Sequence, residues 1–112
     1  MLSIYFHKIN QEVNMKNEYN GHVIYPKILK LEKGSDLLIS LQAIAKKENK
    51  AGYILSIVGN LSKAKIQCPG KQHSTLIKNT LEIISLNGTI DPNRCHLHIS
   101  FSDGNCNVWA GH

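Results

Sequence analysis

Hydrophobic residues near the middle of the chain recur at helical spacing. Five apolar side chains follow one another at intervals of one, three or four residues and form one stripe of a helix: Leu37, Leu38, Leu41, Ile44 and Ala45. Just before them, the GSD segment at 34–36 supplies hydroxyl and carboxylate oxygens that can accept hydrogen bonds from the free N–H groups of a first helical turn. The pattern predicts one helix over residues 35–49.

Short apolar or alternating runs predict strands in the rest of the chain. We expect strands at 23–31, 53–58, 61–68, 81–86, 95–102 and 106–112. The run at 53–58 is almost wholly apolar, which is typical of a strand buried on both faces. Turns are expected at Asn87-Gly88, returning the chain into Thr89-Ile90, and at Asp103-Gly104-Asn105. The sequence therefore predicts an α+β domain, with a mainly antiparallel sheet of about six strands packed against one helix.

Length and composition limit the chain to one small globular unit. A chain of 112 residues is no longer than one typical domain. Its hydrophobic fraction of 42% is enough for one modest core. We expect residues 1–22 to be an N-terminal extension, disordered at least in part, and residues 23–112 to form the domain.

Cysteine content and hydropathy indicate the compartment. The three cysteines are odd in number and form no CxxC pair, which favours free thiols in a reducing environment. No apolar run approaches the ~20 residues that span a bilayer. Polar residues interrupt the N-terminal stretch, where a signal peptide would be continuously apolar. We therefore predict a cytoplasmic protein with no membrane partner.

Charge gives only a weak indication of partners. The formal net charge is +5, and the basic residues are lysines spread along the chain, with Arg94 as the one arginine. No run of five or six consecutive basic residues occurs, so a solvated lysine surface is the simpler interpretation. Any DNA binding is expected to be weak and nonspecific, because lysine contacts to phosphates carry no sequence information.

Histidines form the most informative pattern. Alternate residues of a strand share a face, so His96 and His98 project together with Cα atoms about 6.5–7 Å apart. If Asp103-Gly104-Asn105 is a three-residue loop, paired residue numbers in the hairpin sum to 208, and His112 lies opposite His96 on that same face. A two-residue or four-residue turn would instead place His112 on the other face. Ordinary polar strand residues remain the alternative to a metal site.

Three neutral imidazoles suit a divalent metal ion, most readily zinc. Zinc bound by His96, His98 and His112 would keep a fourth position open, as in catalytic zinc sites. Cys95 is adjacent in sequence, but on a strand it points away from the face that carries His96. The sequence therefore predicts a three-histidine metal site without a sulfur ligand.

Several stretches in order resemble the PPC domain, the plants-and-prokaryotes-conserved family. They are LEKGSDL at 31–37, AGYILSIVGNL at 51–61, LEIISLNGTI at 81–90, HLHIS at 96–100 and AGH at 110–112. Together they span about ninety residues of the chain. The resemblance implies a helix-backed sheet, a homotrimer, and metal ligands at His96, His98 and His112, which match the family's HxH element and the histidine of its Gly-Gly-His.

The chain departs from the family pattern at three places. Ala110 replaces a usual glycine, and residues 79–84 lack the Gly and Arg of the plant partner-binding motif, which argues against plant-type partner recruitment. The family usually continues through another strand or two beyond His112, so we expect a domain without its last strands. An unpaired strand edge left in this way could weaken a trimer.

Two functions are consistent with these features. The first is a stand-alone PPC-like module, without an AT-hook, that assembles as a trimer, binds a metal and has a DNA-binding or regulatory role. The second is a small metal-dependent enzyme that uses the open position on a three-histidine metal, with Glu82 or Asp103 as general base. We favour the module, because neither acid has a diagnostic spacing to the histidines.

Overall fold

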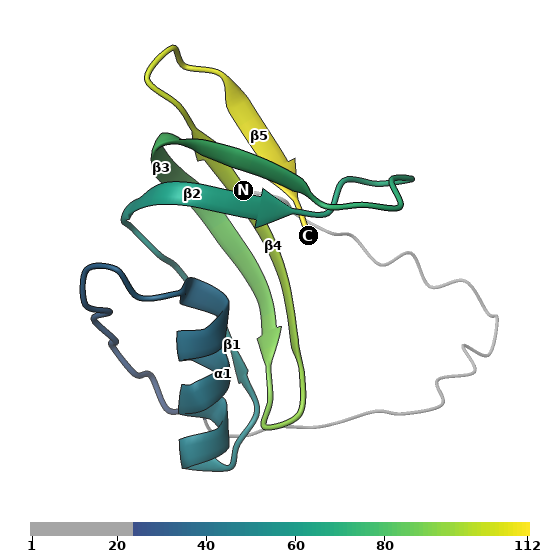
Figure 1. The fold of residues 1–112 in the computed structure, drawn as a ribbon. Helices are drawn as coiled ribbons and strands as arrows, with labels where there is room; N and C mark the ends of the chain where they lie inside the picture. Colours follow the sequence, from purple (N-terminus) through teal and green to yellow (C-terminus); the bar gives the residue numbers. More distant parts are fainter. Residues whose placement is uncertain (1–23) are drawn as a thin grey trace, which may run out of the picture.

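The computed structural model describes residues 24–112, so the expectations for residues 1–22 and for Val23 lie outside the described part. One helix and five strands follow in order: α1 (Leu37–Glu48), β1 (Gly52–Tyr53), β2 (Asn60–Ile66), β3 (Thr75–Ile90), β4 (Cys95–Ser102) and β5 (Val108–Gly111). Every strand pairing is antiparallel. The predicted α+β class is confirmed, with five strands in the described part where about six were expected (Figure 1).

The long strand β3 organises the sheet. Along one edge it pairs with β1 at its C-terminal end and with β2 over its first half. Along its other edge it pairs with β4, which in turn pairs with β5. The sheet curls until the end of β5 returns to the end of β2, where Gln67 and His112 exchange two backbone hydrogen bonds of 2.7 and 3.0 Å (Figure 1).

The helix forms as its sequence predicts. Asp36 is the N-cap, and its carboxylate accepts a hydrogen bond of 2.9 Å from the Ile39 N–H. Asn49 ends the helix in the left-handed conformation, which asparagine tolerates well. Leu41 and Ala45 are buried under the helix, whereas Leu38 is 53% exposed, so the buried stripe is narrower than the apolar pattern suggested.

The core has two parts. Under α1, Leu41 and Ala45 pack with Leu86 and Ile90 of β3. The second part lies within the curl of the sheet and contains Ala64, Ile66, Leu81 and Phe101. Leu81 and Phe101 have no exposed surface. Ile99 of β4 packs against both parts, so the strand that carries two of the histidines is fixed from behind along its length.

Two of the predicted strands are wrong. Residues 24–31 form no strand, and Ile24, Tyr25 and Ile28 are at least 80% exposed, because no described segment pairs with them. The run at 53–58 contributes only Tyr53 to a strand. It is not buried on both faces, since Val58 is 92% exposed.

The predicted turn at Asn87-Gly88 is also wrong, because β3 runs through it without a break. Gly88 has a φ of 140° and lies opposite Leu97 of β4. A Cβ at this position would be 2.0 Å from the carbonyl oxygen of His96. Glycine is required here for the close approach of two strands, and not for a reversal of the chain.

Candidate metal centre

Alternation along β4 separates its two faces as expected. Leu97 packs against the core beneath α1, and the Cys95 thiol donates a hydrogen bond of 3.1 Å to Oε1 of Gln42 on the helix. His96 and His98 are exposed on the opposite face. Cys95 therefore cannot join the histidines, as the sequence indicated.

The hairpin register differs from the predicted one. Ser100 pairs with Ala110 and Ser102 with Val108, so paired numbers sum to 210, and the same register sets His112 against His98 rather than against His96. The Asp103 N–H donates to the Asn107 carbonyl at 3.0 Å, so the loop still has three residues, Gly104 to Cys106, but lies one position later than expected. Cys106, with a φ of 62°, has the left-handed conformation at the end of this loop.

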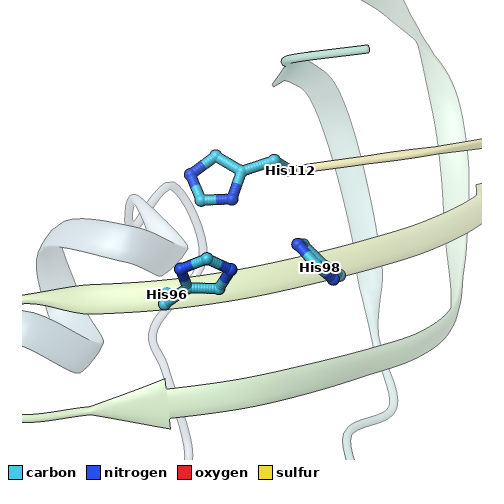
Figure 2. Close-up of side chains that lie close together, drawn as sticks. All are labelled: His96, His98 and His112. Carbon is cyan, nitrogen blue, oxygen red and sulfur yellow. The ribbon is translucent and has the colours of Figure 1, made fainter. Parts of the chain in front are cut away.

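A shift of two residues changes the partner of His112 but not its face. The three imidazole rings therefore gather on one side of the sheet, as Figure 2 shows. Their centroids are 5.1 Å apart for His96–His98, 4.9 Å for His96–His112 and 5.6 Å for His98–His112. The predicted convergence of the three histidines is confirmed, although the register from which it was predicted is wrong.

The donor set fits a metal ion that prefers imidazole. One ring nitrogen from each histidine lies within 4.8 Å of the others. Two nitrogens bound to one tetrahedral zinc at ~2.0–2.1 Å lie ~3.4 Å apart, so the ring nitrogens need to close by up to about 1.4 Å. All three rings are exposed, and side-chain rotation can supply that movement.

His112 is fixed although it is the last residue of the sequence given. Its backbone N–H donates to the Gln67 carbonyl at 3.0 Å, and its carbonyl accepts from the Gln67 N–H at 2.7 Å. A Cβ on the preceding Gly111 would meet that same Gln67 carbonyl at 2.9 Å. A glycine before the histidine thus lets β5 approach the end of β2 and present the third imidazole.

The sequence model of the Plants and Prokaryotes Conserved (PCC) domain matches residues 19–112. The chain belongs to the PCC domain family. This is the family, written PPC above, that the sequence motifs resemble, and the match includes all three histidines.

Relatives and solved structures agree with this assignment. The chain is 37% and 36% identical over 90 residues to the bifunctional protein GlmU of two Synechococcus strains, covering 80% of this chain but only 14% of each relative. A hypothetical protein from Salmonella cholerae-suis superposes with a TM-score of 0.72 at 30% identity, over 75% of this chain and 62% of that one. A Bacteroides thetaiotaomicron protein, described as a candidate DNA-binding protein, gives a TM-score of 0.65 at 23% identity, over 73% and 62% of the two chains.

Electrostatics around His96 of this PCC domain favour the neutral imidazole of that residue. Partial removal of water lowers the pKa of His96, and the charges of His112, His98 and Arg94 lower that pKa further. The Arg94 guanidinium approaches Nδ1 of His96 at 3.4 Å, longer than a normal hydrogen bond. A metal ion binds the neutral form of imidazole, so the surroundings of His96 suit a ligand.

An open cavity of about 590 Å³ adjoins the histidines. His98 and His112 line it together with Asn87, and Ser85 and Ser100 lie on the same side, their hydroxyls 2.7 Å apart. Its lining also includes residues 67–71 at the start of the β2–β3 loop. No aspartate or glutamate is among these lining residues, so the side chains around the cavity offer hydroxyl, amide, imidazole, thiol and ammonium groups.

The two acids considered as general bases lie elsewhere. The Asp103 carboxylate accepts hydrogen bonds from the N–H groups of Asn105 and Asn107 and from the Asn107 side chain. The Asn107 side-chain bond is the main cause that lowers the pKa of Asp103. Glu82 pairs with Ser102, at the end of β4 remote from His96 and His98. Neither acid is among the residues that line the cavity.

Sequence reasoning missed Gln67, which anchors His112. The residue directly follows β2, and no local pattern distinguishes it from any other polar residue after a strand. Its role depends on the curl of the sheet, which brings the ends of β2 and β5 together. Of the remaining histidines, His73 is exposed in the β2–β3 loop, and His7 and His22 lie outside the described residues.

Proposed function

We propose that this PCC domain is a metal-binding module that assembles as a homotrimer and binds DNA weakly, without sequence preference. The observation that carries the proposal is the convergence of His96, His98 and His112, with one nitrogen of each within 4.8 Å of the others. Zinc is the metal that best suits three neutral imidazoles on a small exposed site. Such an ion would keep one coordination position open to water or to a donor atom of a ligand.

Each histidine is positioned by a different feature of the fold. His96 and His98 are fixed by β4, whose opposite face packs against the core, and Gly88 allows β3 to approach that strand closely. His112 is fixed by its backbone pair with Gln67. The scaffold therefore supports a preorganised ligand set, and only the ring torsions need to adjust.

Exposed apolar side chains support self-assembly. Ile24, Ile28, Leu55 and Val58 are 84%, 98%, 76% and 92% exposed. Side chains of this kind are normally covered in a folded protein, and large exposed apolar areas mark association surfaces. A homotrimer, which the family resemblance implies, would cover some of these side chains.

The DNA component rests on charge and on one structural neighbour. The formal net charge of +5 attracts polyanions, and the Bacteroides protein of the same fold is described as a candidate DNA-binding protein. The second function, a metal-dependent enzyme, has less support, because no aspartate or glutamate lines the cavity beside the histidines.

Metal analysis of purified protein tests the central claim. We expect wild-type protein loaded with zinc and then dialysed to retain about one ion per three-histidine site. His98→Ala should lose most of the zinc without loss of fold, because His98 is exposed. His73→Ala is the matched control, an exposed histidine outside the cluster, and should retain the metal.

Equal zinc retention by wild type and His98→Ala would refute the site. Light scattering on the same samples tests the assembly. A monodisperse monomer at micromolar concentration would contradict the homotrimer while leaving the metal result to stand on its own.

A further inference from the structure

The antiparallel arm made of β2 and the first half of β3 has a strongly basic outer face. Lys63 and Lys65 lie on β2, Lys78 lies on β3, and Lys71 lies in the loop that joins them. All four lysines are exposed. From residue 49 to residue 81 the chain contains no aspartate or glutamate. We call Lys63, Lys65 and Lys78 the lysine ribbon.

Strand register places the lysine ribbon on one face. Ala64 and Ile66 are buried in the curl of the sheet, so Lys63 and Lys65, which alternate with them, point outward. Lys63 pairs directly with Lys78 across the two strands. Along β2, Lys63 and Lys65 have Cα atoms about 7 Å apart. The loop of this arm projects from the rest of the sheet (Figure 1).

The arrangement is unfavourable for the isolated domain. Like charges that lie directly opposite each other on neighbouring strands are destabilising. The one ion pair among the described residues joins Lys27 and Glu48, so the lysine ribbon has no acidic partner there. A polyanion would supply the missing negative charge, since it can neutralise several neighbouring ammonium groups at once.

We propose that the lysine ribbon binds the phosphate backbone of double-stranded DNA. The inference rests on the DNA binding proposed above and assigns it to a surface distinct from the histidines. A two-stranded β-ribbon is one of the elements that the major groove of B-DNA admits. Duplex DNA also presents one negative charge per ~1.7 Å of its axis, which is dense enough for all three lysines.

The composition of the arm favours a duplex over other nucleic acids. Single strands are bound by stacking bases on aromatic side chains, and the sequence has no Phe, Tyr or Trp between Tyr53 and Phe101. Double-stranded RNA has a major groove too deep and narrow for side chains to read. Lysine contacts to phosphates carry no sequence information, so binding should be insensitive to base order.

Anisotropy titrations of a labelled mixed-sequence DNA duplex between 50 and 200 mM salt test the proposal. The ribbon variant combines Lys63→Gln, Lys65→Gln and Lys78→Gln. The control combines three exposed lysines elsewhere, Lys30→Gln, Lys33→Gln and Lys47→Gln. Each triple variant lowers the formal net charge of +5 by the same three units.

The expected result for the ribbon variant is a log–log salt slope smaller by about one per lysine, about three in all, with binding lost at the upper end of the salt range. The control should keep a slope close to that of wild type. The ribbon variant should melt at or above the wild-type temperature, because it removes the repulsion between Lys63 and Lys78, and the control should melt close to it. Both variants should retain the zinc content of wild type. Retained zinc would show that the metal site is unaffected.

Three results would overturn the assignment. Equal losses in the two variants would mean that net charge alone attracts DNA, which rejects the ribbon but keeps the DNA binding. No binding by wild type at 50 mM salt would reject both. Tighter binding to a single strand, or to phosphatidylserine vesicles, than to the duplex would show that the surface recognises a different anion.

Discussion

Gly88→Ala is the substitution that most directly connects the fold to the histidine site. Gly88 lies within β3 with a φ of 140°, opposite Leu97 and between the pairs that β3 makes with His96 and His98. An added Cβ would lie 2.0 Å from the His96 carbonyl oxygen and 2.9 Å from Cα of Leu97. These are backbone atoms, so no side-chain rotation can relieve the overlap.

The expected cost has two components. Ordinary contact begins at 3.4 Å, so β3 and β4 must separate locally by more than 1 Å. A non-glycine residue at this φ costs about 1–3 kcal/mol, and each backbone hydrogen bond lost from the pair costs about 1 kcal/mol more. We expect the free energy of unfolding to fall by about 2–5 kcal/mol. Zinc affinity should fall as well, because His96 and His98 move with the backbone of β4.

Urea denaturation followed by circular dichroism measures the stability, and competition with a chromogenic chelator measures the zinc affinity. Gly104→Ala is the control, since an added Cβ there meets nothing within 4 Å and the glycine lies in the exposed β4–β5 loop. It should change the stability by less than about 0.5 kcal/mol. If Gly88→Ala had the midpoint and the zinc affinity of wild type, the close approach of the two strands would not be a requirement of the fold.

Two further predictions concern ionisable side chains. Burial, and then the charge of Asp91, raise the pKa of Cys95, whereas Cys106 is exposed. Iodoacetamide at pH 8 should therefore label Cys106 well before Cys95, and peptide mass mapping measures the two labelling rates. Equal labelling rates would contradict the buried thiol. Hydrogen bonds, chiefly from the Asn107 side chain, lower the pKa of Asp103. The ionised carboxylate therefore stabilises the fold fully above the ordinary pKa of aspartate, and this stabilisation is lost as the pH falls through the lowered pKa of the folded protein. The melting temperature of Asp103→Asn should therefore be lower than that of wild type at pH 7 and approach it near pH 2, and a constant difference at all pH values would refute this role.

Local sequence determined the elements whose signals are complete within a few residues. The helix needs only its apolar stripe and the Asp36 cap, and the structure has both. Alternation on β4 placed His96 and His98 together and Cys95 on the opposite face, because the faces of a strand follow from its two-residue period. The predicted strand at 95–102 has the same bounds in the structure. Family membership also followed from the order of short motifs, and the family match confirms it.

The register of the β4–β5 hairpin was decided by the position at which its loop closes. The Asp103 carboxylate accepts from the Asn107 N–H, and the Asp103 N–H donates to the Asn107 carbonyl, which closes a three-residue loop, Gly104 to Cys106, one position later than expected. The resulting shift of two residues moved His112 from opposite His96 to opposite His98. The face on which a side chain lies depends only on whether the shift is odd or even. The convergence of the three histidines was therefore predicted, although the pairing was not.

Long-range contacts decided the remaining features. The local sequence around Gly88 is typical of a turn. In the structure the glycine is needed because β3 and β4 approach so closely there that a Cβ would overlap the backbone of β4. Residues 24–31 carry the apolar character of a strand and form none, because a strand also requires a partner and no described segment provides one. Gln67 anchors His112, and Lys63 faces Lys78, only because the curl and register of the sheet bring together residues far apart in sequence. The spacing of apolar side chains along an element and the capping of a helix are local properties of a chain. The pairing partner of a strand and the close approach of two strands depend instead on where distant segments come to lie.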